Sequence, residues 1–208
     1  MAATVLRSAR PLATRVTVRA AAPQRTVHVE GKLKELMLVL PNTTPPAGRF
    51  PWAPVITSYF AQPHTTSSYP LHANHMAGTY VPAVRTGNLI FLAGHLPWDK
   101  RGQIIAGRVD QDLDVPTAYE AAKLVTLGLL ATLKRELGDL DKVRRIVKVT
   151  GLVNAGPGFT QHPQVINGCS DLLVAVFGEK GRHARVAAGY SSLPLNAAVE
   201  IDLIAEVE

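Results

Sequence analysis

The C-terminal end of the chain alternates between apolar and polar residues. From Val199 onward, every second side chain is apolar, and acidic residues fill most of the positions between them, with Ile204 the one exception. A period of two predicts a strand with one buried face. The stretch from His183 predicts a second strand, which a Leu-Pro turn at 193–194 joins to the first.

Three segments carry apolar residues at helical spacing instead. The longest is bounded by Asp114 and Gly138, with Pro116 in its first turn, and a competing capping box begins at Thr117. These are the residues expected at the start and end of a helix. The other two predicted helices span Gly31 to Leu40, before Pro41, and Pro163 to Val176, before Gly178.

Short β-rich runs account for the rest of the chain beyond residue 79. Tyr80 to Val84 and Leu89 to Ala93 flank a Gly-Asn pair and predict a hairpin. A short third strand at 104–105 and a longer one from Arg145 to Val153 follow. This order predicts an α+β domain with helices on one side of a mostly antiparallel sheet.

The net charge of +6 lies almost entirely in the first 25 residues. Five arginines precede the first acidic residue, Glu30, and the remaining 17 Lys and Arg residues face 16 acidic ones. A nearly neutral domain does not have the basic surface that nucleic-acid binding requires. The sequence predicts a domain of 79–208, a leader of 23–48 with a short helix, and an N-terminal basic segment of 1–22.

Residues 1–22 are rich in Ala, Arg, Ser and Thr and contain no acidic residue. This composition is typical of an organelle transit peptide and lacks the continuous apolar stretch of a secretory signal. Pro11 interrupts any long amphipathic helix, which favours a plastid (chloroplast) destination over a mitochondrial one. A basic tail without a targeting role is the alternative. No apolar run in the sequence is long enough to cross a membrane.

Cys169 is the only cysteine, which excludes an intramolecular disulfide and a CxxC redox motif. We expect it to be a small packed residue on a helix. Three histidines, His64, His72 and His75, lie together without Cys or acidic neighbours. Solvated loop histidines are a better interpretation of them than a metal site.

Arg185 and Glu200 stand on the two predicted C-terminal strands. A guanidinium binds a carboxylate bidentately, and a carboxylate can orient or deprotonate a water molecule. Together these side chains could bind and hydrolyse a small acid. The alternative is that they are surface charges or partners in an ordinary ion pair.

The run Ala-Arg, Leu-Pro and Val-Glu-Ile ending in Ile-Ala resembles the C-terminal signature of the RidA/YjgF family. The resemblance implies that Arg185 holds a substrate carboxylate and that Glu200 handles the water. A second match, a Tyr-led strand followed by Gly-x-Leu-Pro, implies that Tyr80 and the backbone at Gly94 line the substrate pocket. The deaminases of this family carry a Ser just before that glycine, and this chain has Ala93.

Asn167 to Leu172 resemble the Asn-Gly-x-Ser-Asp-Leu motif of one branch of the family. The better-known members place a pocket Asn on this helix, which makes Ser170 and Asn167 candidates for substrate binding. A polar position on the helix surface is the alternative for both. His183 lies two residues before Arg185 and is a secondary candidate for proton transfer.

The resemblance implies a homotrimer around a central barrel, with pockets between subunits and no metal or organic cofactor. It implies hydrolytic deamination of reactive enamines or imines of 2-oxo acids. Two alternatives are a trimeric metabolite-binding or regulatory protein and RNA cleavage, which the near-neutral charge argues against. Relative to the family, residues 49–78 look inserted, and we expect a poorly ordered loop there, either genuine or an error of the gene model.

Overall fold

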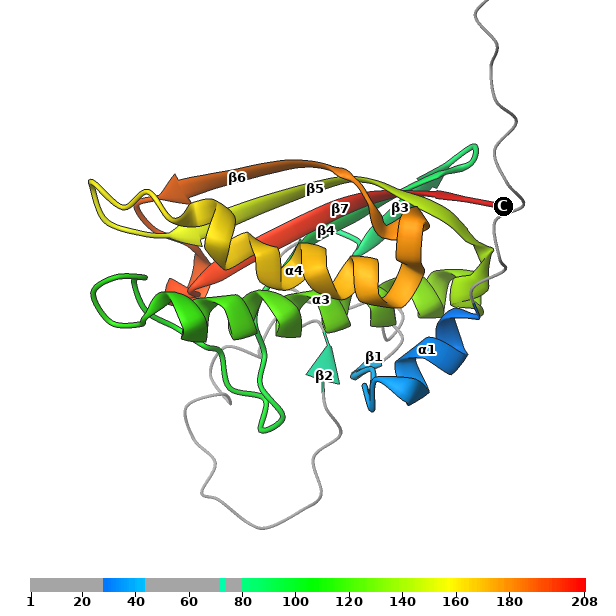
Figure 1. The fold of residues 1–208 in the computed structure, drawn as a ribbon, viewed down its shortest axis with the longest axis horizontal. Helices are drawn as coiled ribbons and strands as arrows, with labels where there is room; N and C mark the ends of the chain where they lie inside the picture. Colours follow the sequence, from blue (N-terminus) through cyan, green and yellow to red (C-terminus); the bar gives the residue numbers. More distant parts are fainter. Residues whose placement is uncertain (1–27, 44–71, 74–79) are drawn as a thin grey trace, which may run out of the picture.

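The computed structural model describes residues 28–43, 72–73 and 80–208 (Figure 1). In chain order the elements are α1 (Val29–Glu35), β1 (Asn42–Thr43), β2 (His72–Ala73), β3 (Ala83–Thr86), β4 (Leu89–His95), α3 (Val115–Leu137), η1 (Leu140–Lys142), β5 (Val143–Asn154), α4 (His162–Phe177), η2 (Gly178–Gly181), β6 (Ala184–Tyr190), η3 (Pro194–Asn196) and β7 (Val199–Val207).

Five strands form one mixed sheet in the order β3-β4-β7-β5-β6. Neighbouring strands are antiparallel except β5 and β6, which are parallel. Helices α3 and α4 lie side by side on one face of this sheet, and no described helix covers the other (Figure 1). The predicted α+β architecture, with helices on one side of a mostly antiparallel sheet, is confirmed.

The alternation of β7 sets which face of the sheet is buried. Its apolar residues at odd positions, from Val199 to Val207, are fully buried under the helices. Glu200, Asp202, Ile204 and Glu206 occupy the even positions and are only partly buried. They define the side of the sheet opposite the helices, which we call the open face.

Helix α3 begins and ends where its sequence signals predict. The Asp114 carboxylate accepts a hydrogen bond from the Thr117 backbone N–H at 2.8 Å, which caps the first turn. Gly138 ends the helix with a positive φ of 76°, a conformation that costs a glycine little. The competing box that begins at Thr117 lies inside the helix and does not form its cap.

Three predicted boundaries were wrong. The leading helix ends at Glu35 rather than at residue 40, because Met37 has a positive φ of 53° that breaks the helical backbone. Strand β3 begins at Ala83, so Tyr80 precedes it. The residues predicted as a third strand at 104–105 make one isolated bridge, between Ile104 and Trp98, because the positive-φ glycines Gly102 and Gly107 interrupt the chain nearby.

The two C-terminal strands follow each other in sequence but are not neighbours in the sheet. The connection through η3 carries the chain from β6 across β5 to β7. Strand β5 and helix α4 each differ from their predicted ranges by one or two residues at either end. Helix and strand ends fray over one or two residues, which the sequence pattern does not show.

Several predictions fall on residues outside the described ranges. These are the leader peptide of 1–22 and most of the predicted insert of 49–78, including His64 and His75. Within that insert, His72–Ala73 form β2, which pairs in parallel with β1. This short pairing was not predicted by the sequence pattern.

Candidate functional site

Arg185 lies on edge strand β6, on the side of the sheet that the helices cover. Its Nη1 donates hydrogen bonds to Asn167 Oδ1 at 2.8 Å and to Ser170 Oγ at 3.0 Å, both on helix α4. Among the described residues, no carboxylate lies within ion-pair distance of it and no partner occupies Nε or Nη2. The predicted candidates Asn167 and Ser170 therefore both contact Arg185 within the chain.

His183 extends this network by one residue. Its Nδ1 lies 2.6 Å from the Gly181 carbonyl oxygen, and its Nε2 lies 3.0 Å from Ser170 Oγ. A carbonyl can only accept, so Nδ1 carries the proton and the Ser170 hydroxyl donates to Nε2. Burial lowers the pKa of His183, and the Arg185 charge lowers it further, which favours this neutral tautomer.

Glu200 lies on the open face of β7, against the neighbouring strand β4. A β-bulge interrupts the pairing there: Ala93 and Gly94 oppose the single residue Asp202, between the pairs Leu92 with Leu203 and His95 with Ile201. A Cβ built at Gly94 would lie 2.1 Å from Glu200 Oε1. The glycine in the bulge is thus what makes room for the Glu200 carboxylate.

The Glu200 carboxyl group is half-buried and lacks an ion-pair or hydrogen-bond partner among the described residues. Burial raises its pKa, and repulsion from Asp202, two residues along the same face, raises it further. Burial also raises the pKa of Asp202, against the opposing influence of the Thr150 hydroxyl and of Lys148. A carboxylate with a raised pKa is a stronger base once ionised. Asp202 was not singled out from the sequence, although the period of two placed it beside Glu200.

Arg185 and Glu200 do not meet within one protomer. In the register of β5 with its neighbours, Arg185 is level with Val149 and Leu203, whereas Glu200 is level with Leu152 and Ala188. The two are offset by roughly 10 Å along the strands and roughly 10 Å across them, and they project to opposite faces of the sheet. The alternative of an ordinary ion pair between them was wrong, because the two side chains do not meet within a single chain.

Three comparisons place the chain among known proteins. The family model described as "YjgF/chorismate mutase-like, putative endoribonuclease" matches residues 68–207. The chain belongs to this family. Protein TCP17 of Trypanosoma cruzi is 41% identical over 132 residues, which cover 63% of this chain and 82% of that protein. A RutC family protein of Pyrococcus abyssi is 31% identical over 132 residues, 63% of this chain and 88% of its own.

A solved structure shares the fold of this chain. A crystal structure of a protein of unknown function from Agrobacterium tumefaciens is 39% identical and has a TM-score of 0.67, covering 87% of this chain and 94% of its own. The RidA/YjgF resemblance in the sequence and the YjgF-type fold of this α+β domain are therefore both confirmed.

Two further positions of the YjgF family pattern, Ala93 and Tyr80, lie toward the same end of the sheet as Glu200. Ala93, where the family's deaminases carry a Ser, is in the bulge beside Gly94. Its backbone N–H donates to the Pro82 carbonyl at 2.9 Å, which holds the segment after Tyr80 against β4. Tyr80 itself is exposed. Tyr80, Gly94 and Glu200 thus come from one end of the β3–β4–β7 side of the sheet, apart from the Arg185 group.

The remaining candidates carry no recognisable chemistry. Cys169 is buried on α4 as expected, and burial raises the pKa of its thiol to about 12. In the described part of the chain, no three His, Cys, Asp or Glu side chains come together as a metal site would require. The described helices are all too short or too polar to span a bilayer.

Proposed function

We propose that this YjgF-family protein hydrolyses reactive enamines and imines of small 2-oxo acids, releasing ammonia. The proposal rests on the surroundings of the two charged candidate residues, Arg185 and Glu200. Arg185 is held by neutral side chains and keeps one edge of its guanidinium free of described partners, and Glu200 is a half-buried carboxylate with a raised pKa. These are the properties of an anion-binding group and of a general base.

In the proposed reaction, Arg185 binds the substrate carboxylate and Glu200 orients a water molecule toward the imine carbon. An enamine first takes a proton at its β-carbon and becomes the protonated imine. Glu200 takes a proton as the water oxygen bonds to the carbon of the protonated imine, giving a neutral carbinolamine. Glu200 then returns that proton to the nitrogen, the hydroxyl gives its own proton to Glu200 as the carbon–nitrogen bond breaks, and ammonia and the 2-oxo acid leave. Tyr80 and the Gly94 backbone border the substrate.

The site needs two copies of the chain. Because Arg185 and Glu200 project to opposite faces, we propose that Arg185 of one protomer faces Glu200 of the partner subunit in a closed homotrimer. The open face supports an interface because it carries exposed apolar side chains without a described covering element, namely Val84, Phe91, Val186 and Tyr190. Exposed apolar side chains that no described element covers are a common feature of interaction sites.

Mixing two inactive variants tests both the chemistry and the shared site. Arg185→Ala and Glu200→Gln should each abolish ammonia release from freshly generated 2-aminoacrylate and 2-iminobutanoate. Refolding the two together should restore about a quarter of wild-type activity, because each mixed ring of three contains one site with both groups intact. Absence of recovery in correctly assembled mixed trimers would rule out the shared site.

Two matched controls accompany these variants. Glu206→Gln changes a carboxylate on the same face of β7 that instead accepts a hydrogen bond from Asn88. Arg182→Ala changes an exposed arginine that pairs with Glu179. Both should keep wild-type activity. A wild-type trimer that fails to accelerate the reaction would contradict the proposed deaminase.

A second candidate is a metabolite-binding or regulatory trimer with little or no turnover. Ala93 favours it, because the hydroxyl that the family's deaminases have at this position is missing. Such a protein would bind 2-oxo acids through Arg185 without accelerating deamination, and Arg185→Ala would abolish that binding.

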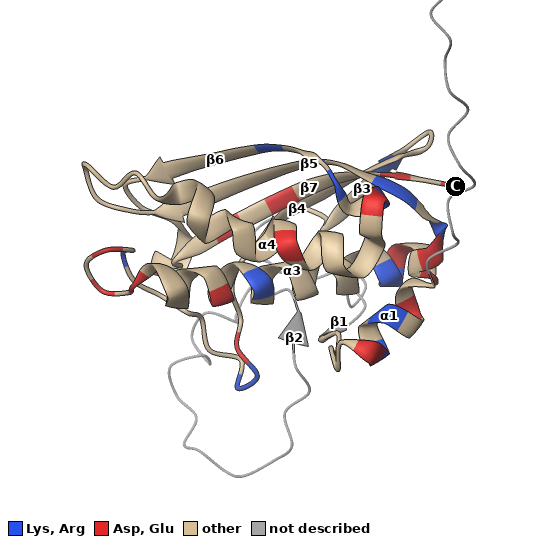
Figure 2. Ribbon diagram, in the orientation of Figure 1, with Lys and Arg blue, Asp and Glu red and all other residues tan. Residues whose placement is uncertain are grey.

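RNA cleavage receives less support from the distribution of charge. Acidic and basic residues are interspersed on α1 and α3 (Figure 2). Several of the basic side chains are paired with carboxylates, as in Lys134 with Glu30 and Arg135 with Glu136. Paired cations compete poorly for phosphates, which a nucleic-acid surface must bind in number.

A further inference from the structure

Helix α4 and residues 181–185 are linked by a directed series of hydrogen bonds that ends on Arg185. The Gly181 carbonyl fixes the proton of His183 on Nδ1, so Nε2 must accept. The Ser170 hydroxyl therefore donates its only proton to His183 Nε2, and its oxygen accepts a hydrogen bond from Arg185 Nη1. Asn167 supplies a second acceptor to the same nitrogen.

These hydrogen bonds leave one edge of the Arg185 guanidinium without a partner among the described residues. Nη1 is the nitrogen farther from the Nε–H bond, so Nε–H and an Nη2–H remain as a parallel pair on the other edge. Neither has a partner among the residues that the structure describes. A parallel pair of N–H groups is the geometry that binds one carboxylate side-on with two hydrogen bonds.

We propose that Ser170 and His183 are positioning residues that hold Arg185 with its Nε and Nη2 edge presented to the substrate carboxylate. On this view neither residue touches the substrate, although the sequence placed Ser170 in the substrate pocket. The inference rests on the proposed function for the identity of the ligand, but the order it assigns to Arg185 exists without any ligand.

The energetic reason is the flexibility of arginine. A free arginine side chain samples many rotamers and loses that freedom when it binds. Because Asn167 and Ser170 already hold Nη1, part of this conformational entropy is lost during folding, and binding of the ligand costs less. Loss of either Ser170 or His183 should therefore weaken carboxylate binding, while the chemistry at Glu200 continues.

The kinetic test compares Ser170→Ala and His183→Leu with His183→Gln. The first two remove a link of this series of hydrogen bonds, whereas the Gln carbonyl can replace Nε2 as the acceptor for Ser170. We expect KM, and the Kd for pyruvate as a non-reacting carboxylate, to rise about tenfold in the first two, with kcat nearly unchanged. His183→Gln should restore values close to wild type.

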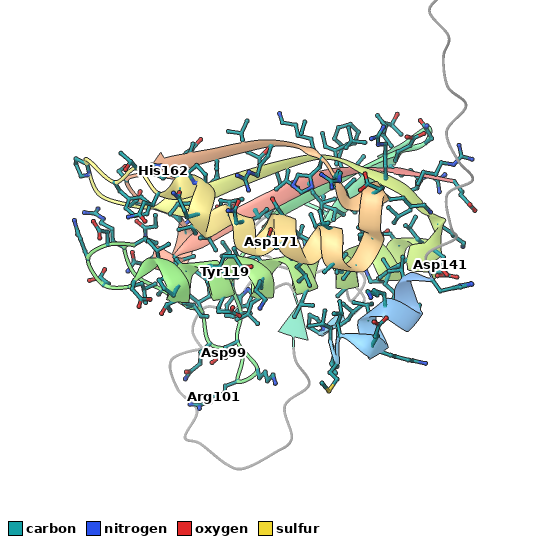
Figure 3. All side chains as sticks on the ribbon, in the orientation of Figure 1. Asp99, Arg101, Tyr119, Asp141, His162 and Asp171 are labelled. Carbon is teal, nitrogen blue, oxygen red and sulfur yellow. The ribbon has the colours of Figure 1, made fainter. Side chains whose placement is uncertain are left out.

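Asp171→Asn is the matched control. Asp171 is next to Ser170 in α4, but its Oδ2 accepts from the Tyr119 hydroxyl of α3 at 2.9 Å, on the side away from β6 (Figure 3). This variant should leave KM and the pyruvate Kd as in wild type. An equal loss in Asp171→Asn would show that the effect is a general loosening of α4, which would overturn the inference.

A measurement without substrate separates this inference from the proposed function. In protein with isotope-labelled arginine, the Arg185 Nη1–H resonance, assigned by its absence in Arg185→Lys, should be resolved and slow to exchange, because these protons are hydrogen-bonded to Asn167 and Ser170. It should move to the position of freely rotating arginines in Ser170→Ala and His183→Leu and stay in His183→Gln. If wild type shows the ordered signal but no deamination, only the proposed function fails.

Three further results would overturn the inference itself. One is an unchanged Arg185 resonance and pyruvate Kd in Ser170→Ala, a small change that keeps α4 intact. Another is a fall in kcat at constant KM, which would give Ser170 or His183 a part in the chemistry. The third is a His183→Gln variant as weak as His183→Leu, since the acceptor would then not be the property that matters.

Discussion

The carboxylate of Glu200 occupies the space that a side chain at position 94 would need. A Cβ at Gly94 would lie 2.1 Å from Oε1 and 3.0 Å from Cδ of Glu200. Real Cβ atoms do not approach other atoms this closely, so the absence of a side chain in the β4 bulge fixes where the carboxylate can lie. This steric constraint therefore acts between strand β4, which carries Gly94, and strand β7, which carries Glu200.

Gly94→Ala should displace the Glu200 carboxylate without removing it. Oε1 is at the end of a flexible side chain, so the fold should survive while kcat falls about a hundredfold, as expected for a misplaced general base. The assay is ammonia release, with KM recorded separately. Gly31→Ala, where a Cβ meets its nearest atom at 3.7 Å, is the control. Wild-type kcat in Gly94→Ala would remove Glu200 from the mechanism.

Asp202→Asn should shift the pH dependence of the reaction. Burial is the larger cause of the raised pKa of Glu200, and repulsion from the Asp202 charge adds to it. If Glu200 must be ionised to act, the acidic limb of the kcat profile marks its pKa, and removing the Asp202 charge should move that limb to lower pH. Glu206→Gln should leave the limb in place. A shift to higher pH, or none, would contradict this electrostatic coupling.

Ala93→Ser should increase deaminase activity. The bulge places this residue beside Gly94, so a hydroxyl here would lie at the same end of the sheet as Glu200. One added hydrogen bond to the substrate is worth about 1 kcal/mol, or about fivefold in kcat/KM. The measurement is steady-state kinetics on 2-iminobutanoate. No gain in a folded variant would show that the missing hydroxyl does not limit this protein.

His95 should make the fold sensitive to acid. Its ring is buried, with Nδ1–H donating to the Ala93 carbonyl and Nε2 accepting from Thr132, and burial lowers its pKa from 6.5 to about 4. The unfolded chain binds the proton more readily, so the stabilising contribution is complete above pH 6.5. It is lost as pH falls from 6.5 to about 4, by about 3 kcal/mol in total.

Chemical denaturation of wild type and His95→Gln at a series of pH values measures how much His95 contributes to the free energy of unfolding at each pH. The variant should be less stable at neutral pH but lose less stability between pH 6.5 and 4, because no buried imidazole remains to be protonated. His28→Gln, which changes an exposed histidine, should keep the wild-type slope. Parallel curves for wild type and His95→Gln would contradict the assignment.

Local signals in the sequence predicted the helices well because they act within a few residues. Helix α3 begins after Asp114, whose side chain caps the first turn, and ends at Gly138, which has a positive φ. Both residue types are recognisable in the sequence as helix-end signals. The period of two in β7 likewise predicted its buried face. The predicted end of the leading helix was wrong because the apolar spacing continues past Met37. That spacing does not reveal the positive φ at Met37.

The site was predicted less completely because its geometry depends on strand order. Arg185, Asn167 and Ser170 were each named from the sequence, and they lie together because a short connection links α4 to β6. Their separation from Glu200 follows from β5 lying between β6 and β7, which no periodicity encodes. The bulge at Ala93 and Gly94 was also missed, because it appears only when β4 is paired with β7.

The order of the strands also has a consequence for how the chain is assembled. Strand β7 follows all the other strands in sequence, yet it lies between the β3–β4 hairpin and the β5–β6 pair. During synthesis these two pairs emerge first and share no strand-to-strand hydrogen bonds until residues 199–207 arrive. Closure of the sheet is therefore a late and non-local step, which theory associates with slow folding. Glu200 enters the molecule with that last strand, so the general base proposed here is in place only after the fold is complete.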